Sequence, residues 1–151
     1  MIAIKTLVGE VEYALAPVTK SLGFLTRVVQ VQINERLRGA GGLSVSPAVF
    51  SALRLVHGNP GIRQGHAARI LQIQESNMAN MIKDLVAQGW IERREEPGKR
   101  IGLWITGKGE EEVEQGAWAD DLDRAYAAAL SDKEYKQLLY LLDRVYRSSL
   151  A

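Results

Sequence analysis

Residues Gly61–Thr106 read GIRQGHAARILQIQESNMANMIKDLVAQGWIERREEPGKRIGLWIT, two helical patterns followed by a hairpin pattern. Apolar residues recur at helical spacing in two groups, with a short gap between them. The first group is Ile62, Ala67, Ala68, Ile70, Leu71 and Ile73, and the second is Met78, Met81, Ile82 and Leu85. Gly89 follows the second group, at the place where helices commonly end on a left-handed residue. The pattern predicts two short helices joined by a tight turn, the second running from about Gln74 to Gln88.

A hairpin pattern follows directly. Trp90 and Ile91 begin an apolar run, and Ile101, Leu103 and Ile105 alternate as in a half-buried strand. The residues between these runs are Glu95-Glu96-Pro97-Gly98-Lys99-Arg100, in which Pro-Gly is a strong turn signal. Helix, turn, helix and hairpin in this order are typical of a winged helix-turn-helix, which places one helix in the DNA major groove.

A set of residues along this region has a characteristic order and spacing. They are Leu43-Ser44 leading to Phe50, Gln64 and Ala68, Gly89-Trp90-Ile91-Glu92-Arg93, and Leu103, Ile105 and Thr106 leading to Gly109. In this order and spacing the chain resembles the MarR-type family of winged-helix transcriptional regulators, over roughly Leu22 to Gly109. The resemblance implies a DNA-binding regulator, most often a repressor, that senses a small phenolic compound or organic anion.

The chain departs from that family at three points. Arg63 stands where a Thr or Ser cap is usual, and Gln72 replaces the usual turn glycine. Pro97 or Gly98 lies where the family wing carries an Asp before its Arg. This last change bears on the usual Asp–Arg brace of the wing tip, and therefore on the orientation of Lys99 and Arg100.

Composition narrows the class of protein. At 151 residues the chain is long enough for one domain, or for one domain with added dimerisation helices. The absence of cysteine excludes disulfides, thiolate metal sites and a thiol-based peroxide sensor. No stretch has the pattern of a signal peptide or the ~20 apolar residues of a membrane span, so we expect a cytoplasmic protein.

Charge is distributed unevenly, although the formal net charge is only +1. Residues 62–108 carry eight Lys or Arg against five Asp or Glu, a net +3. Residues 109–151 carry five against ten, a net −5. This asymmetry would orient the protein on a polyanion, although ordinary solvated helix faces would also explain it.

Helices are predicted on both sides of this region. An apolar stripe at Ile4, Leu7, Val8, Val11 and Leu15 predicts a short amphipathic helix before Pro17. A second helix opens at Pro17 and ends near Arg38, and Ser46-Pro47 starts a third that reaches about His57. After the hairpin, Thr106 caps one long helix to Ala129, and a capping box at Ser131–Glu134 starts the last helix. That last helix is expected to bury Tyr135, Leu138, Leu139, Leu142, Val145, Tyr146 and Leu150.

The fold class is therefore mainly α with a small β-hairpin wing. We expect N-terminal dimerisation helices over 1–38, a winged helix-turn-helix over 43–109 and C-terminal dimerisation helices over 110–151, in one compact subunit. The terminal helices carry more apolar surface than the central region can cover, which favours an interleaved homodimer. A monomer whose end helices fold back on its own core is the alternative.

DNA-contacting residues can be assigned from the outward positions of the second motif helix. Ser76, Asn77 and Asn80 are short polar side chains at its leading end, and Asn can bond adenine with two hydrogen bonds. Phosphate contacts are expected from six further residues, namely Arg63, Gln64, Lys83, Arg94, Lys99 and Arg100. The alternative is that these side chains form an ordinary solvated surface.

No catalytic pattern appears in the sequence, so we do not expect an enzyme. His57 and His66 lack triad partners, metal-ligand spacings are missing, and Gly39-Ala40-Gly41-Gly42 lacks the Lys of a phosphate loop. No cofactor or metal is expected either. The expected partners are a pseudo-palindromic double-stranded DNA operator, a second copy of the chain, and a small effector.

Two points stay open at the level of sequence. The residues Phe24, Arg27, His57 and Trp118 are weak candidates for lining an effector pocket, and an ordinary core or interface role is favoured for each of them. The alternative function is a winged-helix module that binds protein through its apolar end helices and has no specific DNA site.

Overall fold

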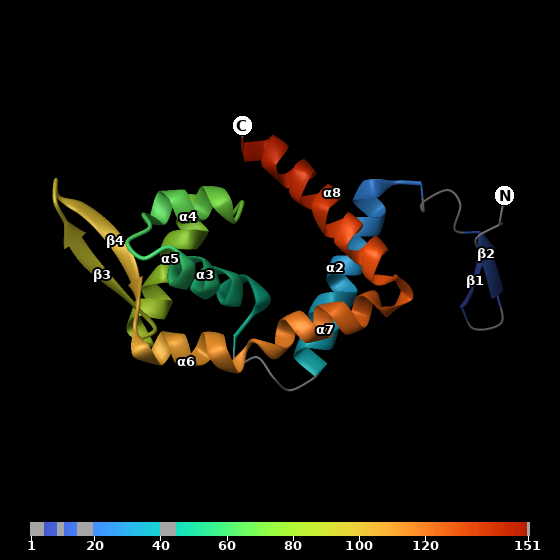
Figure 1. The fold of residues 1–151 in the computed structure, drawn as a ribbon, viewed down its shortest axis with the longest axis horizontal. Helices are drawn as coiled ribbons and strands as arrows, with labels where there is room; N and C mark the ends of the chain where they lie inside the picture. The colour runs from blue at the N-terminus through green and yellow to red at the C-terminus, as the bar shows by residue number, and fades with distance from the viewer. Residues whose placement is uncertain (1–4, 9–10, 15–19, 40–44, 151) are drawn as a thin grey trace. The chain divides into compact units, whose positions relative to one another are not determined.

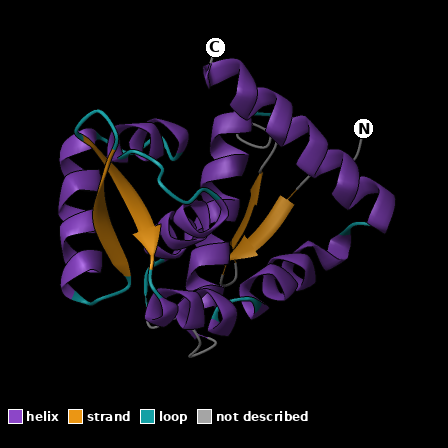
Figure 2. Ribbon diagram, turned by 60° about the vertical axis from the view of Figure 1, so that its left-hand side comes forward, coloured by secondary structure: helices purple, strands orange, loops and turns teal. Residues whose placement is uncertain are grey.

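The computed structural model describes residues 5–8, 11–14, 20–39 and 45–150. They belong to two compact units, Met1–Gly41 and Gly42–Ala151. The described residues are mostly helical, with two antiparallel two-stranded hairpins (Figures 1 and 2). This agrees with the predicted class of a mainly α fold with a hairpin wing. No helix in these ranges is long and apolar enough to cross a membrane.

The first unit contains a hairpin and one helix. Strand β1 (Lys5–Val8) pairs with β2 (Val11–Ala14), with Val8 opposite Val11, and helix α2 spans Leu22–Gly39. The helix predicted over residues 4–15 is therefore wrong where the structure describes it. Thr6, Val8 and Val11 are β-branched, and two residues that include a glycine separate the strands in sequence, which is a hairpin signal.

Helix α2 ends close to the predicted place but begins later than expected. Its first residue is Leu22, and the expected start at Pro17 lies outside the described residues, as do Ile4 and Leu15. The Ser21 hydroxyl accepts a hydrogen bond from the Phe24 N–H at 3.3 Å, as a side-chain cap does. Of the predicted N-terminal helices, the described residues therefore contain one.

The second unit is built on five consecutive elements that match the predicted motif. They are α3 (Pro47–Gly58), α4 (Gln64–Ile70), α5 (Glu75–Ala87), β3 (Ile91–Glu96) and β4 (Arg100–Ile105). The Ser46 hydroxyl caps α3 by accepting from the Val49 N–H, as predicted. Their shared core consists of Leu53, Val56, Ala67, Ala68, Met78, Ile82, Leu85, Trp90, Ile91 and Leu103. These helices and the hairpin therefore share one apolar cluster.

Left-handed backbone marks both ends of α5. Gly89 follows the helix with φ 75°, as its position predicts. Gln72, in the turn between α4 and α5, has φ 54°, a conformation that glycine adopts without steric cost. The Gln72 side chain donates from Nε2 to the Arg69 carbonyl at 2.9 Å, which holds the turn from within.

The long helix predicted from Thr106 to Ala129 is divided in the structure. Helix α6 (Gly107–Gln115) and helix α7 (Trp118–Tyr126) are separated at Gly116, and a short 3₁₀ turn, η1 (Ala127–Ala129), follows. Gly116 lies against the Phe50 ring of α3, so close that a Cβ atom there would overlap the ring. The apolar period continued across this break, which is why the sequence predicted one helix. The predicted Thr106 cap is present, because its hydroxyl accepts from the Gly109 N–H at 3.1 Å.

Helix α8 (Asp132–Leu150) begins at the predicted capping box. The Ser131 N–H donates to Glu134 Oε2 at 2.8 Å, and the Glu134 N–H donates to the Ser131 hydroxyl at 3.4 Å. Hydrogen bonds from the Ser131 hydroxyl, and then from its backbone, hold the pKa of the Glu134 carboxyl below its ordinary value. These reciprocal bonds satisfy backbone donors that the first turn of a helix leaves free.

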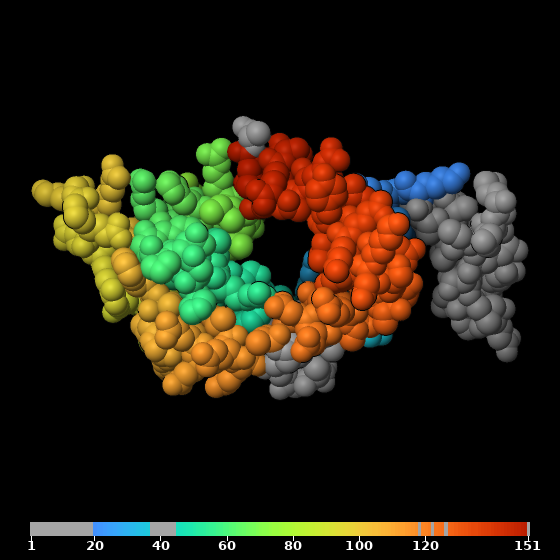
Figure 3. Space-filling model, in the orientation of Figure 1, coloured from blue at the N-terminus to red at the C-terminus, as the bar shows by residue number. Residues whose placement is uncertain are grey.

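The apolar stripe of α8 is not buried within the chain, in contrast to the expectation from sequence. Leu138, Leu139, Leu142 and Val145 are each more than 40% exposed, and no residue of the helix is fully buried. The end of α8 is held by the Tyr146 hydroxyl, which donates to the Ile70 carbonyl at 2.8 Å. Figure 3 shows this end of α8, in dark red, beside the green surface of α4. The described residues of the second unit therefore do not supply a surface that covers this stripe.

We predict that Gly116→Ala destabilises the protein although alanine is the better helix former. An added Cβ would overlap Phe50 Cε2 and lie 2.6 Å from Cζ, and overpacking of this kind costs about 1–3 kcal/mol. Thermal unfolding should show a lower melting temperature for this variant. Gly107→Ala is the matched control, because a Cβ there meets nothing within 4 Å. Equal melting temperatures for the two variants would contradict the assigned role of Gly116.

Candidate nucleic-acid interface

Helix α5 has one buried face and one polar face. Met78 and Ile82 are fully buried and Leu85 is 1% exposed. Ser76, Asn77, Asn80 and Lys83, four of the residues assigned from the sequence, are exposed. Because the buried residues recur every three or four positions, the remaining positions form a continuous outward face. The structure thus brings these four side chains together along one side of a helix of about 20 Å.

The start of α4 lies beside the wing. Arg63 is the N-cap residue of α4, is exposed, and makes no side-chain capping bond. Gln64 is half-buried, and its Oε1 accepts a hydrogen bond from Arg93 Nη2 at 3.2 Å. Of the two residues assigned to phosphate contacts here, Arg63 is open to solvent and Gln64 is bonded to β3.

A backbone bridge joins the wing to the segment that enters α4. The Gly61 N–H donates to the Leu103 carbonyl and the Leu103 N–H donates to the Ile62 carbonyl, both at 2.9 Å. Gly61 and Ile62 therefore lie along β4 like a short third strand. The position of the wing is therefore held by this bridge to the helical core as well as by the β3–β4 pairing.

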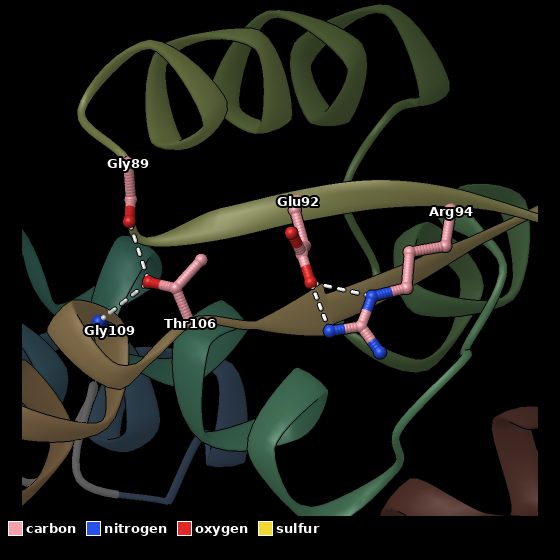
Figure 4. Close-up of polar contacts among 5 residues, drawn as sticks. All are labelled: Gly89, Glu92, Arg94, Thr106 and Gly109. Carbon is pink, nitrogen blue, oxygen red and sulfur yellow. Dashed lines mark hydrogen bonds and ion pairs between the residues drawn. The ribbon is translucent and has the colours of Figure 1, made fainter.

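Thr106 joins the end of α5 to the base of the wing and to α6 (Figure 4). Its hydroxyl donates to the Gly89 carbonyl at 2.6 Å while it accepts from the Gly109 N–H. Its own N–H donates to the Trp90 carbonyl at 3.0 Å. Lys108 adds a bond from Nζ to the Gln88 carbonyl at 2.9 Å, at the negative end of the α5 helix dipole. These bonds fix the angle between α5 and the wing.

Arg94, assigned from the sequence to a phosphate contact, is engaged within the wing. Its guanidinium donates to the Glu92 carboxylate, from the same strand (Figure 4). The guanidinium carbon also lies 4.6 Å from the centre of the Trp104 ring. Trp104 pairs directly opposite Glu92 in the hairpin. This arrangement accounts for Trp104 as a packing residue, although it is opposite in parity to the core-facing Leu103 and Ile105.

The wing tip presents the two remaining assigned cations. Gly98 and Lys99 both have positive φ, of 87° and 56°, and together they turn the chain from Glu96 to Arg100. Lys99 and Arg100 are exposed, and no ion pair involves either of them within the described ranges. Their charges are therefore available to an anionic partner.

Two hollows lie beside these elements. A groove of about 360 Å³ is lined by Gln64, Arg93, Ile101 and Leu103, between the start of α4 and the wing. A smaller hollow of about 80 Å³ is lined by Gln64, Gly65, Ala68 and Glu75, between α4 and α5. Gln64, which accepts the bond from Arg93, lines both hollows.

The residues considered for an effector pocket fall in different units of the chain. Phe24 and Arg27 belong to the first unit, and His57 lies exposed in the last turn of α3. The Trp118 side chain lies outside the described residues. Neither of the hollows beside α4 is lined by any of these four.

Sequence reasoning missed Glu92, Trp104 and Thr106 as organising residues of this surface. Strand parity could have found the first two, because Glu92 and Arg94 are two residues apart and so share a face. Thr106 was recognised as a helix cap, but its second bond, to Gly89, depends on tertiary structure and leaves no local signal.

Comparison with known proteins places this fold in a family. Residues 43–101 match the model of the MarR family. A Thauera aromatica protein, named as a candidate transcriptional regulatory protein for the hcr operon, is 31% identical over 108 residues. That match covers 68% of this chain and 64% of the relative, so the chain spans less than two thirds of the relative's length.

Solved structures agree with the family match. The transcriptional repressor CouR bound to a 23-mer DNA duplex is 24% identical, with a TM-score of 0.77, and the match covers 89% of this chain and 99% of CouR. The same repressor bound to p-coumaroyl-CoA is 25% identical, with a TM-score of 0.74, over 85% of this chain and 94% of CouR. With its helix order, its wing and these matches, the chain belongs to the MarR family.

Proposed function

We propose that this chain is a homodimeric, sequence-specific DNA-binding transcriptional regulator, acting as a repressor, whose operator binding is modulated by a small organic ligand. The observation that carries the proposal is the polar face of α5. It presents Ser76, Asn77, Asn80 and Lys83 outward beside a wing with two cations that form no ion pair with any described residue. Short polar side chains at the leading end of a helix fit the major groove, and flanking cations fit phosphates.

The assigned residues divide into two roles under this proposal. Asn77 and Asn80 contact base edges, with adenine as the favoured base, and Ser76 lies beside them. Arg63, Lys83, Lys99 and Arg100 contact phosphates and set the position of the protein on the duplex. Gln64 contributes through its bond to Arg93, which ties the start of α4 to the wing.

The exposed apolar residues of α8 support the homodimer. Leu138, Leu139, Leu142 and Val145 recur at helical spacing and stand 41–57% exposed. A contiguous apolar stripe of this kind marks an interface, and an amphipathic helix is marginal in water without a partner face. In a two-fold dimer the two α5 helices enter successive major grooves about 34 Å apart.

The CouR structure with p-coumaroyl-CoA supports an aromatic organic anion as the class of effector. An effector that binds the dimer better when its α5 helices do not match the groove spacing would shift the population towards that state. Release from DNA then needs only that the effector bind the dimer that does not match the groove spacing more tightly than the dimer that does. A tenfold difference corresponds to about 1.4 kcal/mol.

Selection from a random-sequence duplex library, followed by titration of the selected DNA, tests the proposal. Asn80→Ala should weaken binding to the selected site by about 1–3 kcal/mol while leaving binding to unrelated DNA unchanged. Lys83→Ala should weaken binding to both, and reduce the salt dependence by about one phosphate contact. The matched control is Lys136→Ala on α8, an exposed lysine far from α5 in sequence. If neither α5 variant changes DNA binding, the assignment of α5 is wrong.

Salt also separates this function from the alternative, a protein-binding winged helix. Affinity for DNA through phosphates falls steeply as the salt concentration rises, whereas an interface with an apolar core is much less sensitive. Wild-type protein that selects no DNA sequence at low salt would exclude the regulator and favour the protein-binding module.

The dimer can be tested through α8. Leu142→Glu places a charge in the exposed apolar stripe, where Leu142 is 41% exposed. Burying an unpaired charge in an interface is strongly unfavourable, so sedimentation should show this variant as a monomer and wild-type protein as a dimer. Lys136→Glu introduces the same side chain on the same helix outside the stripe and should leave the dimer intact. Dimers of unchanged stability in both variants would remove α8 from the interface.

Ligand response can be measured on the same selected DNA. We expect an aromatic carboxylate such as p-coumarate, or its coenzyme A thioester, to lower the affinity of the wild-type dimer for DNA. Fluorescence anisotropy of the labelled duplex should fall as the effector is added at fixed protein concentration. Benzyl alcohol, which has the ring without the acid, is the control. Equal responses to all three compounds would argue against an anionic effector.

A further inference from the structure

Three side chains form a connected cluster on one face of the wing. The hairpin register places Glu92 opposite Trp104, and Arg94 opposite Gly102. The Arg94 guanidinium donates to the Glu92 carboxylate through two nitrogens (Figure 4). It also covers the Trp104 ring, with 4.6 Å between the guanidinium carbon and the ring centre. We call Glu92, Arg94 and Trp104 the Arg94 clamp.

The clamp reaches beyond the hairpin to the segment that enters α4. A Cβ atom at Gly61 would lie 3.4 Å from Cζ2 of Trp104, so the indole packs against the backbone there. Gly61 is also bonded through its N–H to the Leu103 carbonyl. The clamp therefore connects β3, β4 and the residue three positions before α4.

The wing tip has less restraint of its own. Gly98 and Lys99 turn the chain in left-handed backbone conformations, and among the described residues no ion pair involves Lys99 or Arg100. Restraint on the direction of the tip then comes from side chains further along the hairpin. On the strand face opposite Leu103 these are the clamp residues and Glu96, whose carboxylate lies close to the backbone of Gly61 and Gly102.

We propose that Arg94 is a positioning residue, held by Glu92 and Trp104, that fixes the direction of the wing relative to α4. Phosphate contacts from the wing then come from Lys99 and Arg100. The inference rests on the proposed DNA-binding function and deepens it. A guanidinium that is neutralised by a neighbouring carboxylate adds no net charge, so it releases few counterions from DNA.

A purely electrostatic role and a positioning role of Glu92 predict opposite effects on DNA affinity when its carboxylate is removed. Removing a carboxylate close to phosphates should strengthen binding if only charge matters. If Glu92 holds the clamp, its removal frees Arg94 and should weaken binding in spite of the more favourable net charge. The sign of the effect of Glu92→Gln therefore decides between the two roles.

Hydrogen–deuterium exchange tests the clamp in the absence of DNA. We expect Glu92→Gln and Arg94→Lys to increase exchange at backbone amides of residues 97–101 by about threefold to fivefold, the range for one exposed ion pair or cation–π contact. Glu95→Gln is the matched control, because this exposed carboxylate lies on the opposite face of the same strand. Exchange unchanged in all three variants would overturn the clamp.

Titration of the selected duplex then tests its effect on binding. Glu92→Gln and Arg94→Lys should each reduce affinity by about threefold or more with the salt slope unchanged, whereas Glu95→Gln should bind as well as wild type or better. A direct phosphate contact would instead leave Arg94→Lys nearly as tight as wild type.

The two proposals fail in different ways. Tighter binding by Glu92→Gln, with exchange as in wild type, would overturn the positioning role of Arg94 while DNA binding stands. A second outcome is faster exchange in the clamp variants together with a wild-type protein that selects no DNA sequence. It would overturn the proposed function and support the clamp as a restraint on the wing.

Discussion

Burial of the apolar stripe of α5 is the constraint on which the rest of the second unit depends. Met78, Ile82 and Leu85 are removed from water almost completely, and each side chain of this kind contributes about 1.5–3 kcal/mol when buried. No other orientation of α5 buries all three, so the rotation of the helix about its axis is fixed. The polar face is outward because the apolar face is inward.

The wing is oriented by contacts on more than one side. Thr106 bonds the end of α5 at the base of the hairpin, and Arg93 bonds Gln64 at the start of α4. The Gly61–Leu103 bridge adds a backbone connection. Because these contacts converge from both helices of the motif, the wing and the polar face of α5 behave as one surface. The net charge of +3 between residues 62 and 108 comes from Arg63, Arg69 and Lys108, because α5 and the wing together carry equal numbers of acidic and basic residues.

The motif itself could be predicted from sequence because its signals are local. Helical spacing, a glycine with positive φ at position 89, and a Pro-Gly turn each report on a few neighbouring residues. The errors lie where tertiary contacts decide. Gly116 divides a continuous apolar period because the Phe50 ring occupies the space beside it, and no neighbouring residue signals this. At residues 5–14, apolar spacing fitted a helix and a hairpin alike, and β-branched residues favoured the hairpin.

The sequence predicted the positions of the candidate site residues more completely than their roles. The outward residues of α5 follow from periodicity alone, but the pairing of Arg94 with Glu92 and Trp104 depends on hairpin register. Sequence can place a cation on a strand; whether its charge is already neutralised is decided by the neighbours that folding brings to it.

The hydrogen bond from Tyr146 to the Ile70 carbonyl gives α8 a mechanical connection to the helix-turn-helix. Ile70 is the last residue of α4, two residues before the left-handed Gln72 and five before α5 begins. Helix α8 has 19 residues and so is about 28 Å long, and its C-terminal end is bonded next to that turn. A slight tilt at its far end would reach the turn through the Tyr146 hydroxyl and through Arg69, whose guanidinium donates to the Leu150 carbonyl at 3.3 Å, without any ligand near the DNA.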